Sequence, residues 1–171
     1  MLNLKKILGS TWFKRIYFAI SLLLLGIGLY SVINPEPFLK FGYPGIFVFN
    51  ALGGLGTFLI PTLSSQMNIW LLALATATGM GINDSISWLA GRGGSEAVYK
   101  MKWVPRVEKF LDTYGWKPLF VLSVLPLPYD AIGLILGYLG LDYLKFFIPM
   151  VVGKFVRVIL IGYGYQWLIS I

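Results

Sequence analysis

The chain has 171 residues, of which 57% are hydrophobic and 12% are charged, and its formal net charge is +7. This apolar share exceeds that of an ordinary soluble domain, so we expect lipid to surround most of the chain. Cysteine and histidine are both absent. Their absence excludes disulfides and removes the commonest general base and the commonest metal ligands. The composition therefore disfavours an enzyme, and we expect neither a cofactor nor a metal site.

Residues 1–35 combine a basic N-terminal segment with an apolar stretch. The apolar part, 16–33, is long enough for one membrane span and lacks a small-residue cleavage site. We interpret it as a retained span with the N-terminus in the cytoplasm. Lysine and arginine gathered on the cytoplasmic side would explain the net charge without nucleic-acid binding.

The segment 44–90 is predicted to form a broken hairpin followed by a span. Residues 44–65 carry "GGLG" at their centre, with an apolar arm on either side. An arm of about ten residues reaches roughly half-way across a 30 Å hydrocarbon core. We therefore expect a re-entrant hairpin over 44–65 and a transmembrane helix over 68–90, with a single kinked span as the alternative for 44–65.

Residues 91–116 form a polar, basic loop that is expected in the cytoplasm. Its "RVEKFLDTYG" predicts a short amphipathic helix that ends at Gly115. If every apolar block crossed the membrane, this loop would lie outside, against the positive-inside rule. A re-entrant hairpin over 44–65 returns the loop to the cytoplasm.

Residues 117–171 repeat the design of the first half. The hairpin 117–140 has "PLPYD" at its centre, and the span 146–169 follows, although a kinked single span remains an alternative for 117–140. The two halves would cross the membrane in opposite directions, an inverted-topology repeat that many transporters use. We also expect Gly81 and Gly153 to permit close helix contacts.

These elements predict an all-α membrane protein with a single membrane domain over 1–171. It comprises an N-terminal span and two inverted repeats, each a re-entrant helical hairpin followed by a transmembrane helix. We expect it in a prokaryotic plasma (inner) membrane. The sequence leaves a homo-oligomer open.

Four ionisable residues fall within the predicted membrane segments: Asp84, Asp130, Lys154 and Arg157. An isolated charge at the bilayer centre costs several kcal/mol, so these side chains should face the protein interior and pair. In particular, we expect Asp130 to contact Lys154 and Arg157. The charges would form either a structural ion-pair network or a site for an anionic or protonatable substrate.

Two asparagines lie close to these charges in the predicted layout. Asn50 falls in the first hairpin and Asn83 precedes Asp84. Either could donate hydrogen bonds to a substrate or cap a broken helix. The termini of broken helices also present free N–H groups that can hold an anion.

Four segments carry a family resemblance: "GINDSISWLAGRGG", "RVEKFLDTYG", "VLPLPYDAIGLILGYLGLDYLKF" and "VVGKFVR". Together they resemble the DedA superfamily, whose members contain a VTT (SNARE-associated) domain, over roughly residues 40–165. Many members have a glutamate in the first hairpin and an arginine in the second. This chain has Asn50 and Asp130 in those regions, and Lys154 and Arg157 could supply the positive charge.

The resemblance implies a transporter or scramblase that moves a lipid or lipid phosphate, such as undecaprenyl phosphate or phospholipid, between leaflets. Membrane lipids are then the expected partners, with proton coupling as a further expectation. The expected polar midplane site comprises Asp84, Asp130, Lys154, Arg157, Asn83 and Asn50. A proton-coupled exporter of small solutes and a non-transporting membrane scaffold are the alternatives.

Overall fold

The computed structural model describes residues 19, 22–23, 26–27, 29–31, 33–53, 55–93, 98, 102–127 and 129–171. Most of the span predicted over 16–33 lies outside these residues, as does part of the loop 91–116. The described residues are helical wherever they have regular structure, which confirms the all-α fold class.

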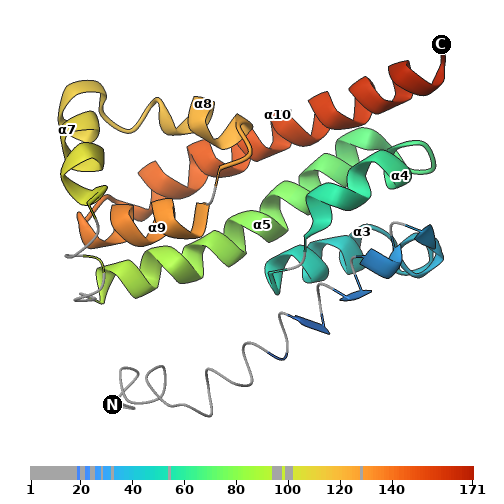
Figure 1. Cartoon of the computed structure of the whole chain (residues 1–171), viewed down its shortest axis with the longest axis horizontal. Coiled ribbons are helices and arrows are strands. Elements are labelled where there is room, and N and C mark those ends of the chain that lie inside the picture. Colours follow the sequence, from blue (N-terminus) through green and yellow to red (C-terminus); the bar gives the residue numbers. More distant parts are fainter. Residues whose placement is uncertain are drawn as a thin grey trace.

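Two long helices that run in opposite directions form the centre of the molecule, α5 (Ile69–Arg92) and α10 (Tyr143–Ile169) (Figure 1). Each begins at a side-chain cap. Asn68 accepts hydrogen bonds from the backbone N–H groups of Trp70 and Leu71, and Asp142 does the same for the two residues after Tyr143. These caps satisfy N–H groups that the helix itself leaves unpaired.

The helices α5 and α10 correspond to the predicted spans 68–90 and 146–169. In the described part of the chain, no helix has the combination of length and apolar character needed to cross a membrane.

The segment predicted as the first hairpin contains α3 (Glu36–Ala51), the 3-10 helix η1 (Gly56–Leu59) and α4 (Ile60–Ser64). The helix breaks where the sequence predicts it, and Gly53 adopts a positive φ of 93° there. α3 begins earlier than the predicted arm, with a kink at Gly42 (φ 61°). The kink precedes Pro44, which has no N–H for the helical ladder.

The segment predicted as the second hairpin contains α8 (Leu119–Val124) and α9 (Tyr129–Tyr138). The helix again breaks at the proline-containing centre of the segment. In the first hairpin, α3 packs against α5 and α4 against α10. In the second, α8 packs against α10 and α9 against α5. Each long helix therefore packs against one arm of each hairpin.

The predicted amphipathic helix forms as α7 (Val104–Tyr114). It ends at Gly115, which has a positive φ of 66°, as its sequence indicates. Val107 and Leu111 pack into the apolar cluster around Trp88 and Leu136, so α7 covers α9 at one end of the molecule.

Glycines set the closest approach between helices. A Cβ atom on Gly91 would lie 2.0 Å from the carbonyl oxygen of Leu134, and one on Gly137 would lie 2.0 Å from that of Trp88. The backbones of α5 and α9 are therefore in direct contact. The expected close contacts of Gly81 and Gly153 are confirmed, since a Cβ atom on either would collide with a side chain.

Besides a small apolar cluster between α7 and α9, two larger apolar cores fill the described part of the molecule. One joins the first hairpin to the start of α5 and the later part of α10, around Ile60 and Leu72. The other joins the second hairpin to the end of α5 and the start of α10, around Trp88 and Phe146. Between them along α5 and α10 lie Asp84, Lys154 and Arg157, so the buried charges separate the two cores.

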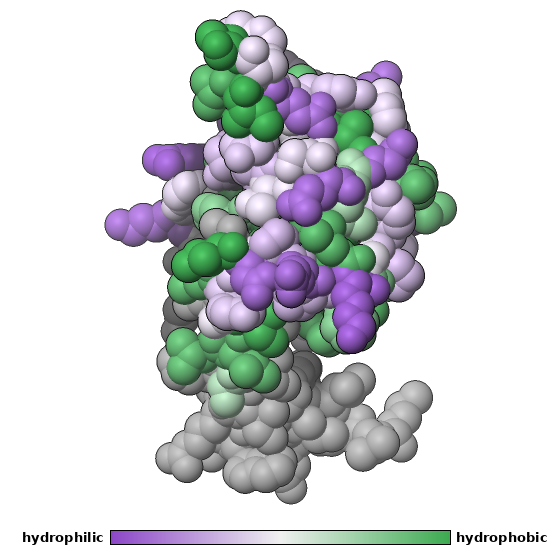
Figure 2. Space-filling view, turned by 90° about the vertical axis from the view of Figure 1, so that its right-hand side faces the viewer, coloured by the Kyte–Doolittle hydropathy of each residue, from purple (hydrophilic) through white to green (hydrophobic). Residues whose placement is uncertain are grey.

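The two ends of the long helices carry polar residues. One end holds α7 and the connection from α9 to α10, and the other holds the connection from α4 to α5 and the C-terminus (Figure 1). Figure 2 views this second end and shows hydrophilic residues spread among hydrophobic ones. Gln66 and Asn68 in the connection from α4 to α5 are exposed polar residues, and so is Lys40 on α3.

Candidate functional site

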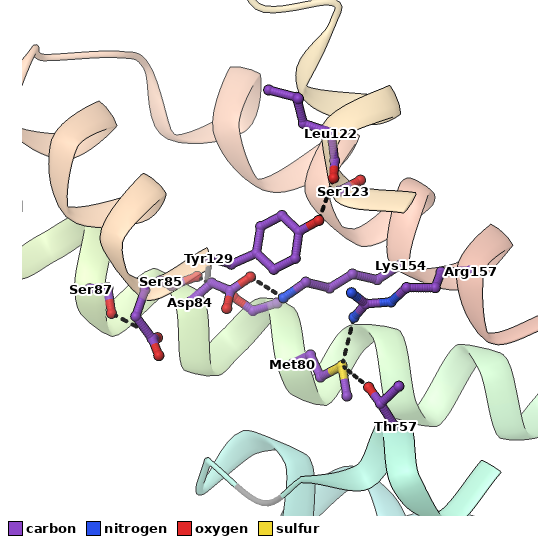
Figure 3. A network of polar contacts seen from close by, with 12 residues as sticks. Thr57, Met80, Asp84, Ser85, Ser87, Leu122, Ser123, Tyr129, Lys154 and Arg157 are labelled. Atoms are coloured by element: carbon purple, nitrogen blue, oxygen red, sulfur yellow. Dashed lines mark hydrogen bonds and ion pairs between the residues drawn. The ribbon is translucent and has the colours of Figure 1, made fainter. Parts of the chain in front are cut away.

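An ion pair between Asp84 and Lys154 forms the centre of the site. Asp84 lies on α5 and Lys154 on α10, and their side chains are only 6% and 3% exposed. The Lys154 ammonium donates a hydrogen bond to the Asp84 carboxylate (Figure 3). Because each charge would be costly to bury alone, each makes burial of the other possible.

The ring of Tyr129 covers the two basic side chains. Its centroid lies 4.8 Å from the Lys154 ammonium nitrogen and 5.5 Å from the Arg157 guanidinium carbon. Its hydroxyl group donates toward the carbonyl oxygens of Leu122 and Leu125, at the end of α8 (Figure 3). Tyr129 therefore ties the start of α9 to the end of α8 and places a π face over the cations.

Arg157 is the least satisfied charge of the site. It is 9% exposed, and its Nη1 donates to the Leu125 carbonyl oxygen at 3.2 Å. Its Nη2 contacts the Met80 sulfur at 3.6 Å, and a thioether is a weak acceptor. Its Nε is buried without a hydrogen-bond partner. In the described part of the chain no carboxylate forms a salt bridge with Arg157.

Met80 connects Arg157 to the first hairpin. The Thr57 hydroxyl, on η1, approaches the Met80 sulfur at 3.8 Å from the other side (Figure 3). Since Arg157 also bonds Leu125, it lies between the broken centres of the two hairpins. The site thus has contributions from both hairpins and both long helices.

Asn50 lies near the end of α3, and Asn83 lies on α5 beside the centre of the first hairpin. The Asn50 side chain is buried and donates to the Ile46 carbonyl oxygen at 2.8 Å, while its own Oδ1 has no partner. A Cβ atom on Gly56 would lie 2.1 Å from this Oδ1. Asn83 is half-buried, and its Oδ1 would lie 3.3 Å from a Cβ atom on Gly53. Among the residues that the structure describes, neither asparagine hydrogen-bonds to the buried charges and neither side chain caps a helix.

The expected contact of Asp130 with Lys154 and Arg157 is wrong. Asp130 is exposed, at the first turn of α9, and accepts a hydrogen bond from the Ser87 hydroxyl at 3.1 Å. Tyr129, the preceding residue, points inward instead. One position along a helix rotates a side chain by about 100°, which is enough to move it from the interior to the surface.

Sequence reasoning missed Tyr129, Met80 and Thr57. Met80 precedes Asp84 by one helical turn, so its position on the same face was available from the spacing alone. Tyr129 and Thr57 carried no such signal, because their positions depend on how each hairpin turns. In the described residues, no three Asp, Glu, His or Cys side chains gather as a metal site would require.

This geometry can bind an anion. Asp84 and Lys154 neutralise each other, so the Arg157 guanidinium leaves an excess of positive charge in a buried place. A guanidinium donates several N–H bonds in a fixed plane that suits phosphate and carboxylate oxygens. The buried Thr76 hydroxyl on α5 also has no partner and could donate, whereas the unpaired Asn50 Oδ1 is an acceptor and does not favour an anion.

The VTT domain family matches residues 43–166. The chain therefore belongs to this family, the DedA or SNARE-associated family, whose members are membrane-associated. Comparison with curated proteins and with solved structures gives no match.

Proposed function

We propose that this protein moves a lipid with an anionic, phosphate-type headgroup between the two leaflets of a membrane. The observation that carries the proposal is the buried Arg157, whose charge has no carboxylate partner in the described residues and whose Nε is unpaired. An uncompensated buried cation is costly, and an anionic headgroup would relieve that cost during passage. Membership of a membrane-associated family supports a lipid as the substrate.

The outer faces of the long helices support contact with lipid tails. On α5, Ile82, Ile86 and Leu89 are exposed, and on α10 so are Ile148 and Val152. Their spacing of three to four residues places each set on one face of its helix. Contiguous exposed apolar surface of this kind marks contact with a membrane or a partner.

The packing of the arms supports the inverted-repeat arrangement within this proposal. In each half, the first arm packs against the long helix that follows it, and the second arm packs against the long helix of the other half. The same relation in both halves is what a two-fold repeat produces. The re-entrant hairpins would then bring their broken centres together beside Arg157.

Lipid exchange in liposomes tests this function. The wild-type protein should accelerate leaflet exchange of fluorescent lipids that carry a phosphate-type anionic headgroup. Arg157→Met should remain folded and lose most of this exchange. Arg157→Lys should retain part of it, because lysine keeps the positive charge but lacks the planar guanidinium group. Lys145→Met is the matched control, since Lys145 is an exposed cation on the same helix.

Two results would overturn the proposal. Wild-type protein that exchanges neither phospholipids nor polyprenyl phosphates would exclude the lipid substrate. An Arg157→Met protein that exchanges lipids at the wild-type rate would remove the site from the mechanism. In the first case, folded protein without exchange would favour a non-transporting scaffold, in which the charges only join the helices.

A role for Asp130 in proton coupling remains a separate proposal. Its exposed carboxylate and its hydrogen bond to Ser87 leave it accessible to solvent protons. Asp130→Asn should then abolish any dependence of exchange on a pH gradient while preserving the fold. Exchange with unchanged pH dependence in Asp130→Asn would exclude this role.

A further inference from the structure

We propose that the cleft between α7 and α9 holds one acyl chain of an anionic phospholipid, with the lipid phosphate against Lys102. The cleft has a volume of about 470 Å³. Such a volume falls within the range of about 300–1,000 Å³ that small-molecule sites occupy. The proposal rests on the proposed function in taking a membrane lipid as the ligand.

The lining of the cleft suits an apolar chain. Trp103 and Val107 line it from the α7 side, and Leu127, Ala131 and Ile132 from the second hairpin. Trp103 is 65% exposed and Leu127 is 37% exposed, although both are large apolar side chains. An inserted acyl chain would bury this exposed apolar surface, which is favourable.

The charge around the cleft selects an anionic headgroup. Among the described lining residues, Lys102 alone is charged, and it is exposed. Lys102 precedes α7, and Arg106 on α7 is exposed as well, whereas farther along the helix Lys109 is flanked by the exposed acids Glu108 and Asp112. Positive charge is therefore gathered at the start of α7, beside the cleft, and basic residues of an amphipathic helix are attracted to anionic lipid surfaces.

The position of the cleft relates it to the buried site. Ala131 and Ile132 face the cleft from the first turns of α9. On another face of the same turns, Tyr129 covers Lys154 and Arg157, and Gly133 contacts α5. A lipid chain in the cleft would therefore lie one helix diameter from the buried cations, separated from them by α9.

Photocrosslinking tests the cleft directly. The full chain is placed in phosphatidylcholine vesicles with a trace of either phosphatidylglycerol or phosphatidylcholine that carries a photoreactive acyl chain. Crosslinked peptides are then mapped by mass spectrometry. We expect phosphatidylglycerol to label the segments around Trp103 and Ile132 more strongly than phosphatidylcholine does.

Variants separate the chain from the headgroup. Lys102→Ala should lower phosphatidylglycerol labelling about fivefold, the effect of about 1 kcal/mol for one basic residue near an anionic lipid. Lys109→Ala is the matched control and should leave labelling unchanged, because Lys109 is exposed on α7 but does not line the cleft. Ile132→Trp should fill the cleft and reduce labelling by both lipids.

Equal labelling by the two lipids, together with an unaffected Lys102→Ala, would overturn the proposal, as would labelling confined to other segments. Should Ile132→Trp fail to fold, the exposed Lys102→Ala still decides the matter. Crosslinking measures binding and the liposome assay measures exchange. If the protein is labelled as expected but exchanges no lipid, the cleft proposal stands and the proposed function fails. If the protein exchanges lipid but the cleft is not labelled, the proposed function stands and the cleft proposal fails.

Discussion

Asp84 of α5 and Lys154 of α10 form an ion pair in which the carboxylate side chain is 6% exposed and the lysine side chain 3% exposed. The pair joins the two long helices between the two apolar cores. Because both charges are buried, removing one leaves the other uncompensated, while replacing both with apolar side chains removes the buried pair as a whole.

Asp84→Asn should therefore destabilise the fold by about 3–5 kcal/mol, the cost of an unpaired buried charge. The double variant Asp84→Leu with Lys154→Met, which replaces both charges with apolar side chains, should recover most of this loss. Thermal unfolding of the purified proteins measures both effects. A single variant as stable as wild type, or a double variant no better than the single one, would contradict the buried pair.

Tyr129 allows its hydroxyl and ring contributions to be separated. Tyr129→Phe keeps the ring over Lys154 and Arg157 but loses the hydrogen bonds to the Leu122 and Leu125 carbonyls. It should cost about 0.5–1.5 kcal/mol, as one hydrogen bond does. Tyr129→Leu should cost more, because it also removes the cation–π contacts. Equal stability of the two variants would show that the ring contributes nothing.

Because α5 and α9 are in close contact, adding a single methyl group to a glycine between them should destabilise the fold. Gly137→Ala would place Cβ 2.0 Å from the Trp88 carbonyl oxygen, and backbone cannot yield as a side chain can. We expect a loss of about 1–3 kcal/mol from overpacking. Gly164→Ala on α10 is the control, since its Cβ would meet nothing within 4 Å.

Gly164→Ala should leave stability unchanged or raise it by up to about 1 kcal/mol, because alanine favours the helix over glycine. Thermal unfolding compares the two variants under identical conditions. If Gly137→Ala is as stable as Gly164→Ala, α9 does not lie against α5 as described.

The two long helices begin at side-chain caps of the same kind. Asn68→Ala removes the acceptor for the N–H groups of Trp70 and Leu71, which it binds at 3.0 and 3.2 Å. We expect a loss of about 1 kcal/mol, and Asn68→Asp should retain the cap. Asp142→Ala should behave like Asn68→Ala, and the two losses should add because the caps lie on different helices and share no partner. Non-additive losses in unfolding measurements would indicate coupled helix starts.

Cysteine labelling checks the proposed orientation, because the chain has no native cysteine. Lys40 lies at the start of α3 and Lys109 on α7, and both are exposed. A membrane-impermeant thiol reagent added to intact cells should label Lys40→Cys. It should label Lys109→Cys only after the membrane is opened. Labelling of both from outside would exclude a cytoplasmic α7.

The sequence by itself determined the local features of this protein. Its hydrophobic composition and apolar blocks predicted helices, "GGLG" and "PLPYD" marked the hairpin breaks, and Gly115 marked the end of α7. These signals are local, since glycine conformation and the missing proline N–H act within a few residues. The family resemblance and the buried position of Asp84, Lys154 and Arg157 also followed from sequence.

The tertiary structure alone decided which charges meet. The spacing on α10 put Lys154 and Arg157 on one face, but the rotation and offset of α5 and α9 selected Asp84 rather than Asp130 as the partner. A rotation of about 100° per residue separates Tyr129, which covers the cations, from Asp130, which faces outward. The same packing left Arg157 without a full set of hydrogen-bond acceptors and formed the cleft beside Lys102. Neither feature could be predicted from the sequence, because each depends on contacts between segments far apart in the chain.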